Sequence, residues 1–479
     1  MQTDVAVVGA GAAGLYTALC AAHQGARVTL ISATPLAESS TYWAQGGLAA
    51  ALAQDDSPEL HLADTVKTGR GTVRESAAGV LCREAPAAVE HLQRLGVSFD
   101  ADRAGTLALG LEGGHSARRI VHAGGAATGR RLIRQLSALV AEDGRVEVLE
   151  GRRAIGVITI GGRVAGLRLA DGASVSASAV VLATGGAAAL WSRTTNPAGA
   201  TGGGLLLAFA AGAELADLEF MQFHPTAVAA PNGADGFLVT EAIRGEGALL
   251  LDAAGERFVN ELAPRDEVAR AVQRQMALRG AGSVDLDMRE VDPALFPNVV
   301  SALKRAGIDP ERELVPVAPA AHYMMGGIAT DLNARASIPG LYAVGECSCT
   351  GLHGANRLAS NSLTECFVFG LRAARSAIEE PGPAGGEPDA PVHEPPPGLS
   401  AESREALWRY GGLERDEAGL RRLLQNAHPL VRLIAASALA RTETRGAHVR
   451  LDHPVRNPAF DGTHVAIGDG APPQIERWD

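Results

Sequence analysis

The segment Asp4-Val-Ala-Val-Val-Gly9-Ala-Gly11-Ala-Ala-Gly14-Leu15 carries the clearest structural signal in the chain. Its apolar run stops at a glycine, as a buried parallel strand does when it ends in a tight turn. Gly9 permits the turn, Gly11 leaves room for a pyrophosphate, and Gly14 lets the next helix pack closely. A helix over residues 12–23 would direct its free N–H groups and dipole at the phosphates. The segment predicts a dinucleotide site, and a turn that is merely rich in glycine is the alternative.

Later segments extend the same predicted sheet. A second strand is expected at residues 25–31, and Ser178–Gly186 and Gly340–Glu346 are again typical of buried strands that end in glycine. Strand-like segments near 146–149, 154–160 and 164–169 are separated by glycine-containing turns that favour hairpins. Antiparallel strands after a Rossmann unit are known from flavin disulfide-reductase-like folds. The predicted class is therefore α/β, or α+β overall.

Changes in composition along the chain suggest its domains. We expect a Rossmann-like domain over 1–217 and 324–380, with an α+β capping domain inserted over 218–323. Residues 381–398 are rich in Pro and Gly and predict a linker. A C-terminal helical domain is expected over 399–479, with an irregular tail after Asp452.

Composition also narrows the classes of function. A net charge of −11 argues against a nucleic-acid surface. The chain opens directly into a strand without a signal peptide, and no apolar run reaches membrane-spanning length, so we expect a cytoplasmic protein without membrane contact. The five cysteines are scattered without a CxxC pair, which predicts neither a disulfide framework nor a metal site.

Polar motifs are concentrated in the middle of the chain and just after it. Phe220–Thr226, Thr240–Gly247 and Leu262–Asp266 place polar groups between apolar flanks, as site-bearing segments do. Glu112–Ser116 combines an acid and a histidine with glycines, and Gly351–Ser362 precedes a predicted helix. Each motif alone is also consistent with a structural histidine or a solvated turn.

Together the motifs resemble those of the fumarate reductase, succinate dehydrogenase and L-aspartate oxidase flavoproteins. The matching segments cover almost the whole chain: Gly9–Gly14, Thr41–Gly47, Glu112–Ser116, Gln222–Thr226, Thr240–Gly247, Ala263–Arg270, His322–Gly327, Gly340–Glu346, Gly351–Glu365 and Arg445–His448.

The resemblance implies that FAD lies in the first domain, with its isoalloxazine ring at the junction with the capping domain. Ser40 stands where succinate dehydrogenases keep the histidine that is bonded to FAD, which implies non-covalent binding. The implied cofactor contacts are Gly9, Ala10, Gly11, Ala12, Ala13, Gly14, Ser40, Thr41, Tyr42, Trp43, Ala44, Gln45, Gly46, Gly47, Glu346, Ser362 and Leu363.

The family further implies a C4 dicarboxylate bound at the same junction. Burying two charged ends requires paired donors. By resemblance, His224, His322 and Arg357 contact the substrate carboxylates, and Thr240 and Ser360 supply hydroxyl groups.

Arg265 matches the catalytic arginine of the family, which donates and accepts a proton. A guanidinium group loses its proton only above about pH 12 in water, so such a base needs partners that relay the proton. Glu241 and Arg244 match these partners.

Glu112 separates the members of the family. By resemblance to the aspartate-oxidising members, this acid faces the α-amino group of the substrate. Succinate and fumarate have no amine, and a carboxylate beside these dianions would be repulsive. The sequence therefore favours an amino-acid substrate.

Two positions depart from the family pattern at the cofactor. Ser32-Ala33 stands where the second strand ends, so a ribose-binding acid is missing there. Gly202-Gly203-Gly204 replaces Gly-Asp-Gly, which removes an expected FAD contact.

The expected activity is oxidation of L-aspartate to iminoaspartate, with FAD reoxidised by O2, giving H2O2, or by fumarate. The product would enter NAD biosynthesis through quinolinate synthase. A soluble fumarate reductase or succinate dehydrogenase flavoprotein subunit is the alternative. A non-catalytic dinucleotide-binding sensor is the alternative from another class.

Overall fold

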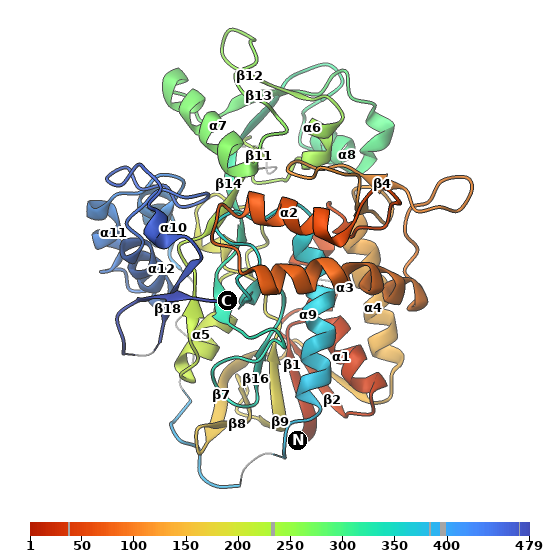
Figure 1. The fold of residues 1–479 in the computed structure, drawn as a ribbon, viewed down its shortest axis with the longest axis vertical. Coiled ribbons are helices and arrows are strands. Elements are labelled where there is room, and N and C mark those ends of the chain that lie inside the picture. The colour runs from red at the N-terminus through yellow and green to blue at the C-terminus, as the bar shows by residue number, and fades with distance from the viewer. Residues whose placement is uncertain (37–38, 231–234, 383–384, 393–398, 469) are drawn as a thin grey trace.

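The computed structural model describes residues 1–36, 39–230, 235–382, 385–392, 399–468 and 470–479. It has the mixed α/β architecture that the sequence predicts. The largest sheet forms the lower part of the molecule in Figure 1. Its strands, in spatial order, are β6 (Val146–Glu150), β2 (Val28–Ser32), β1 (Gln2–Val8), β9 (Ser174–Leu182), β8 (Arg163–Leu169) and β7 (Ala154–Ile160), with β16 (Leu341–Ala343) also paired to β9.

The glycine turn after β1 is closed by backbone contacts that no side chain could share. Gly9 has a φ of +108°, and a Cβ on it would lie 2.2 Å from the carbonyl oxygen of Ala183. A Cβ on Gly14 would lie 1.9 Å from the carbonyl oxygen of Gly9. These contacts hold α1 (Ala12–His23) against the sheet and confirm the predicted strand–turn–helix unit.

The pairing of the large sheet follows the sequence pattern. The pairs β1–β2, β1–β9, β2–β6 and β9–β16 are parallel, so the two glycine-ended segments near 180 and 342 join β1 in the same sheet as predicted. β7, β8 and β9 are antiparallel. Gly161 and Gly162, with φ of +61° and +72°, make the turn between β7 and β8.

Helices cover the sheet and bury most of the apolar side chains of its strands. The expected helical stretch at 58–95 forms two helices, and the helix expected at 362–379 is α9. Tyr16 of α1 and Phe367 of α9 pack edge to face with their rings 5.1 Å apart. No helix of the described ranges combines the length and the apolar character needed to cross a bilayer. Besides α1, the helices that cover the sheet are α2 (Pro58–Thr68), α3 (Glu75–Arg94), α4 (Thr128–Glu142), α5 (Gly203–Ala210) and α9 (Asn361–Ala377).

A separate antiparallel sheet with its own apolar core forms the upper part of the molecule in Figure 1. Val268, Leu286 and Val317 are among the fully buried members of this core. We retain residues 218–323 as the proposed extent of this capping domain. Its elements are β11 (Met221–Val228), β14 (Val315–Met324), β13 (Val284–Asp287) and β12 (Leu249–Leu251), with α6 (Glu241–Gly245), α7 (Arg265–Arg279) and α8 (Pro297–Arg305).

The last part of the chain is helical only at first. It begins with α10 (Ala401–Gly411), α11 (Glu417–Leu423) and α12 (Pro429–Ala440). The tail after Asp452, expected to be irregular, instead forms the hairpin of β18 (Thr463–Ile467) and β19 (Gln474–Arg477). β18 pairs with β10 (Leu215–Ala216), nearly 250 residues earlier, and this long-range pairing orders the tail. The predicted linker at 381–398 lies partly outside the described residues.

Two further sheets are built largely from short strands. β15 (Gly327–Ala329) and β17 (Ser348–Cys349) join β10, β18 and β19 in one sheet. The other sheet consists of β3 (Leu48–Ala49), β5 (Ile120–Val121) and β4 (Leu109–Gly110).

Buried charges tie the end of α12 to the chain just before β11. Arg441 donates from Nε to Glu219 Oε1 at 2.6 Å, and both side chains are fully buried. Ser437 also donates to Glu219, and Arg441 forms a further ion pair with Glu443. Burial raises the pKa of Glu219, although the charge of Arg441 opposes the shift. Removing one member of such a pair leaves the other charged and desolvated.

Arg441→Met is therefore expected to destabilise the protein by about 3–5 kcal/mol, as breaking a buried ion pair does. Urea and thermal unfolding of the purified protein measure the change. The control is Arg421→Met, because the Arg421–Glu417 pair is exposed and should contribute less than about 1 kcal/mol. Equal stability of the two variants would contradict a structural role for the buried pair.

Candidate active site

One cavity of ≈ 1540 Å³ runs from the glycine turn after β1 to the junction with the capping domain. Most residues predicted for the cofactor line it, and so do eight of the nine predicted substrate and catalytic residues. Gly14, Tyr42 and Arg244 do not line it. Gly14 lies under the turn, and Arg244 lies behind Glu241. The predicted residues that line the cavity are Gly9, Ala10, Gly11, Ala12, Ala13, Ser40, Thr41, Trp43, Ala44, Gln45, Gly46, Gly47, Glu112, His224, Thr240, Glu241, Arg265, His322, Glu346, Arg357, Ser360, Ser362 and Leu363.

The cofactor end of the cavity has the groups that a dinucleotide requires. α1 begins at this end with a glycine N-cap that has no capping side chain, and the Ala12 N–H donates to Thr41 Oγ1 at 3.3 Å, so the following N–H groups of the first turn face a phosphate site. Around Gly11, a Cβ would meet only Thr41 Oγ1, at 3.5 Å. Gln45 Oε1 is buried without a hydrogen-bond partner in the described chain. These features fit FAD, whose phosphates and ring carry the complementary groups.

Glu346 lies at the cavity wall and accepts a hydrogen bond from the Met324 N–H at 3.0 Å. Desolvation raises the pKa of its carboxyl group to about 7. Near neutral pH this group can therefore both donate and accept hydrogen bonds, which suits a ligand with hydroxyl groups.

The two departures from the family pattern are visible in the structure. Ser32 and Ala33 line the cavity at the end of β2, and Ser32 Oγ donates to the carbonyl oxygen of Thr34 at 2.6 Å. Gly203 lines the cavity as well, and a Cβ on it would meet nothing within 4 Å. The space that an aspartate side chain would occupy is thus left open.

Two histidines from neighbouring strands of the capping sheet meet at the other end of the cavity. The centres of the His224 and His322 rings are 5.1 Å apart, and the ring planes are inclined by 64° in an edge-to-face arrangement. Burial and the charge of Arg265 hold the pKa of both well below the ordinary value, so both rings are neutral at pH 7. The Thr226 N–H donates to His224 Nδ1 at 3.3 Å. The proton of the His224 ring is therefore on Nε2, which makes Nε2 a donor.

Arg265, Glu241 and Arg244 form a continuous row. Arg265 begins α7, and its Nε donates to Glu241 Oε2 at 2.6 Å, while Arg244 Nη2 lies 3.7 Å from the same oxygen. Burial acts to raise the pKa of Glu241, but the charges of Arg265 and Arg244 outweigh it and keep the pKa below the ordinary value. Burial lowers the pKa of Arg244. Glu241 thereby links the Arg265 cation at the cavity to the Arg244 cation in the interior of the capping domain.

Glu112 lines the same cavity. Its Oε2 accepts a hydrogen bond from Ser360 Oγ at 2.7 Å, and it forms no ion pair with any described residue. The next residue, Gly113, packs against Glu241, because a Cβ there would lie 2.1 Å from Glu241 Oε1. Thr240, the residue before α6, lines the cavity nearby. The site thus holds a buried carboxylate that lacks a cation.

Gln222 belongs to one of the motifs that carry the family resemblance, but it was not predicted as a residue of the site. Its Oε1 accepts from Arg265 Nη1 at 3.1 Å and from Arg357 Nη2 and Nε at 3.1 and 3.3 Å. Its Nε2 donates to the Arg357 carbonyl and to Asn356 Oδ1. Its place two residues before His224, which puts both side chains on the same strand face, is the signal that could have revealed it.

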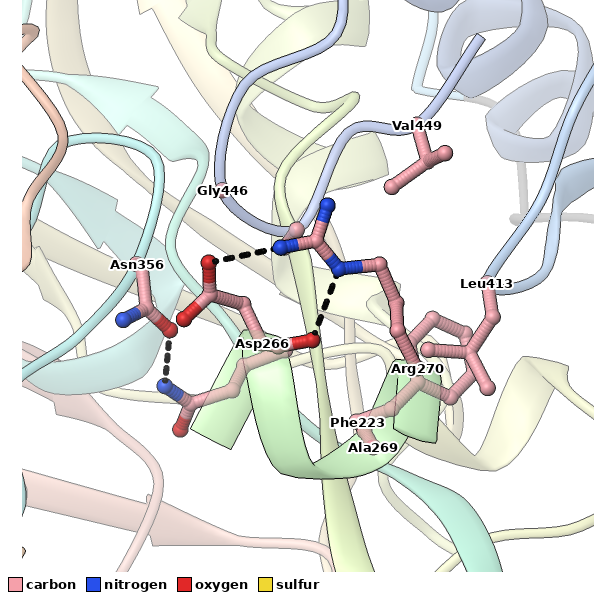
Figure 2. A pocket seen from close by; sticks show the side chains of 10 residues that line it. Phe223, Asp266, Ala269, Arg270, Asn356, Leu413, Gly446 and Val449 are labelled. Atoms are coloured by element: carbon pink, nitrogen blue, oxygen red, sulfur yellow. Dashed lines mark hydrogen bonds and ion pairs between the residues drawn. The ribbon is translucent and has the colours of Figure 1, made fainter. Parts of the chain in front are cut away.

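A second layer supports the start of α7 from behind. Figure 2 shows Asp266 and Arg270 in contact, with Gly446 and Val449 of the C-terminal segment close by. Asp266 Oδ1 also accepts from Arg70 Nη2 at 3.0 Å, and the Arg70 carbonyl accepts from Arg445 Nη1 at 2.6 Å. The conformation of the turn next to Arg265 is therefore held from the C-terminal segment.

Known proteins share both the sequence and the fold. A family described as "FAD binding domain" matches residues 4–363, and "Fumarate reductase flavoprotein C-term" matches residues 414–476. An L-aspartate oxidase from Caulobacter vibrioides is 46% identical over 98% of this chain and 97% of its own length. An L-aspartate oxidase from Streptomyces coelicolor is 42% identical over 98% and 91%.

Among solved structures, a mutant FrdA chain of E. coli quinol fumarate reductase aligns with a TM-score of 0.90 at 29% identity, over 100% of this chain and 97% of that one. Its similarity supports the fold, and the near full-length sequence relatives establish the narrower group. The family resemblance inferred from the motifs is thus confirmed, and the chain belongs to the L-aspartate oxidase family of FAD-binding flavoproteins.

Proposed function

We propose that this protein oxidises L-aspartate to iminoaspartate. FAD, when bound in the cavity, supplies the acceptor for the hydride that leaves Cα. Loss of that hydride and of one proton from the substrate ammonium group gives the protonated imine, so two electrons are removed. O2 takes these electrons with two protons to become H2O2, or fumarate takes them with two protons to become succinate.

The observation that carries this proposal is Glu112. It is a buried carboxylate at the cavity wall whose hydrogen-bond donor, Ser360, is neutral. Burying an unpaired carboxylate is costly, and a substrate ammonium group would remove this cost. A dicarboxylate without an amine would leave two negative charges facing Glu112. An amino dicarboxylate is therefore the substrate class that the charges favour.

The substrate carboxylates are proposed to bind the cationic and neutral donors around Arg357. Contacts with Gln222 and Ser362 use three of its five N–H groups, counted over the described residues, and leave one on Nη1 and one on Nη2. These two are suited to one carboxylate. His224, through Nε2–H, and His322 and Thr240 are proposed to take the remaining oxygens.

Arg265, with Glu241 and Arg244, is proposed to handle the proton. Glu241 forms an ion pair with each of the two arginines, so a change in the charge of Arg265 is compensated by the charges of Glu241 and Arg244. In aspartate oxidation the row balances the proton that leaves the substrate nitrogen. With fumarate as oxidant, the same row would supply the proton that adds to carbon.

Binding of FAD without a covalent bond is proposed because Ser40 replaces the histidine that holds FAD in succinate dehydrogenases. A reaction in the cytoplasm, with release of the product to quinolinate synthase for NAD biosynthesis, is part of the same proposal. A soluble fumarate reductase or succinate dehydrogenase subunit is the second candidate, and the shared fold with quinol fumarate reductase favours it.

Anaerobic addition of L-aspartate to the purified yellow protein is expected to bleach the flavin absorbance rapidly, because the two electrons have no other acceptor. Acid precipitation should release the flavin into the supernatant. Bleaching by succinate but not by aspartate would favour the second candidate. Absence of bleaching by either would favour a dinucleotide-binding sensor.

Glu112→Gln is expected to lower kcat/KM for L-aspartate about 100-fold while fumarate reduction by the pre-reduced protein largely survives. The amide keeps the hydrogen bond from Ser360 but loses the charge that meets the ammonium group, which is worth roughly 3 kcal/mol when desolvated. The exposed variant Glu417→Gln serves as the charge-matched control. Equal loss of both activities would refute this role for Glu112.

A further inference from the structure

Arg357 rests on an aromatic ring rather than on a carboxylate. Its guanidinium carbon lies 4.4 Å from the centre of the Tyr323 ring. Its hydrogen-bond acceptors are the neutral oxygens of Gln222 and Ser362, and it forms no ion pair within the described chain. Burial and the charge of Arg265 lower the pKa of Arg357 to about 10. The stability of this cation therefore depends on neutral acceptors and on the face of the ring.

The Tyr323 hydroxyl is hydrogen-bonded to a buried polar cluster that consists of Glu365, His353 and Thr350. It donates to Glu365 Oε2 at 3.1 Å, and His353 Nε2 lies 2.9 Å from the same oxygen. Thr350 Oγ1 donates to Glu365 Oε1 at 3.2 Å. The Glu365 side chain is only 1% exposed. Both carboxylate oxygens thus have donors, as a buried carboxylate requires.

Tyr323 connects the cavity to the cluster. Tyr323 lines the cavity, whereas His353, Thr350 and Glu365 do not. Glu365 lies one turn after Ser362 on α9, so the helix that supplies Arg357 with a hydroxyl acceptor also anchors the ring. Burial and the charge of Glu365 raise the pKa of Tyr323 well above the ordinary value, so its hydroxyl stays a donor at neutral pH.

We propose that Glu365 is a positioning residue that, with His353, fixes the Tyr323 ring and thereby the guanidinium plane of Arg357. A hydrogen bond to a carboxylate also enriches the electron density of the phenol ring, which strengthens its attraction for the cation. The ring then holds Arg357 with its two remaining N–H groups directed at a carboxylate. This inference rests on the proposed binding of a substrate carboxylate by Arg357.

Holoenzyme variants Tyr323→Phe, Glu365→Gln and the double variant test the proposal. Each is expected to weaken succinate binding about tenfold, the size of one hydrogen bond to a charged group, and to raise KM for aspartate more than it lowers kcat. Flavin absorbance perturbation measures the succinate dissociation constant. The flavin content and the unliganded flavin spectrum should match those of the wild-type protein.

The double variant separates positioning from general damage. If Glu365 acts through the tyrosine hydroxyl, the double variant loses no more affinity than the weaker-binding single variant. Additive losses of affinity would overturn the proposal. Unchanged succinate binding in Tyr323→Phe would overturn it as well. Tyr323→Phe keeps the ring, so it remains the test if Glu365→Gln does not retain FAD. The control is Glu84→Gln. It removes a charge that pairs with Arg372, which lies on α9 as Glu365 does.

Failure of the proposed function would be seen differently. In that case aspartate would not bleach the flavin of the wild-type holoenzyme, whether or not succinate binds to it. If the wild-type protein binds both and the variants are unaffected, only the positioning role fails.

Discussion

Two guanidinium groups, those of Arg265 and Arg357, share one amide oxygen in the protein interior. Each belongs to a different segment, one at the start of α7 and the other in the loop before α9, and Gln222 of β11 lies between them. Like charges held this close repel each other strongly in a medium of low polarity. The surrounding contacts reduce that repulsion, because Glu241 pairs with one cation and the Tyr323 ring supports the other. A dianionic ligand would complete the balance, which supports the proposal that this part of the cavity binds two carboxylates.

The fold brings these groups together by placing the capping sheet over the end of the cofactor cavity. β11 and β14 bring His224 and His322 to the cavity, and Ser360 and Ser362 line it just before and within the first turn of α9. Charge complementarity then divides the site. The cavity presents two kinds of group: cations and neutral donors, and the carboxylate of Glu112, which, unlike that of Glu241, forms no ion pair with a described residue. A substrate with two carboxylates and one ammonium group matches both kinds of group at once.

Sequence reasoning was strongest where local geometry dictates the residue. The turn after β1 requires glycine at position 9 and close packing at position 14, so the pattern alone predicted the first strand, turn and helix. The charged residues of the site were assigned by resemblance, and the structure gathers them around one cavity, although their roles stay predictions. Gln222 was missed because an uncharged amide attracts attention only through its place, two residues before His224 on one strand. Arg244 was expected at the site but lies behind Glu241, since sequence does not show depth. The strands of the tail were missed because their partner, β10, is remote and only two residues long.

The pairing of β18 with β10 has a consequence for the synthesis of the protein on the ribosome. Asp217, directly after β10, is fully desolvated in the native state and accepts hydrogen bonds from the Val465 N–H and from His464 Nδ1. A nascent chain that has not yet reached residue 464 lacks both donors, so the segment that leads into the capping domain stays incomplete until β18 has been synthesised. The segment after β10 thus reaches its native contacts only when β18 has left the ribosome, and until then chaperones that shield exposed strand edges have access to it.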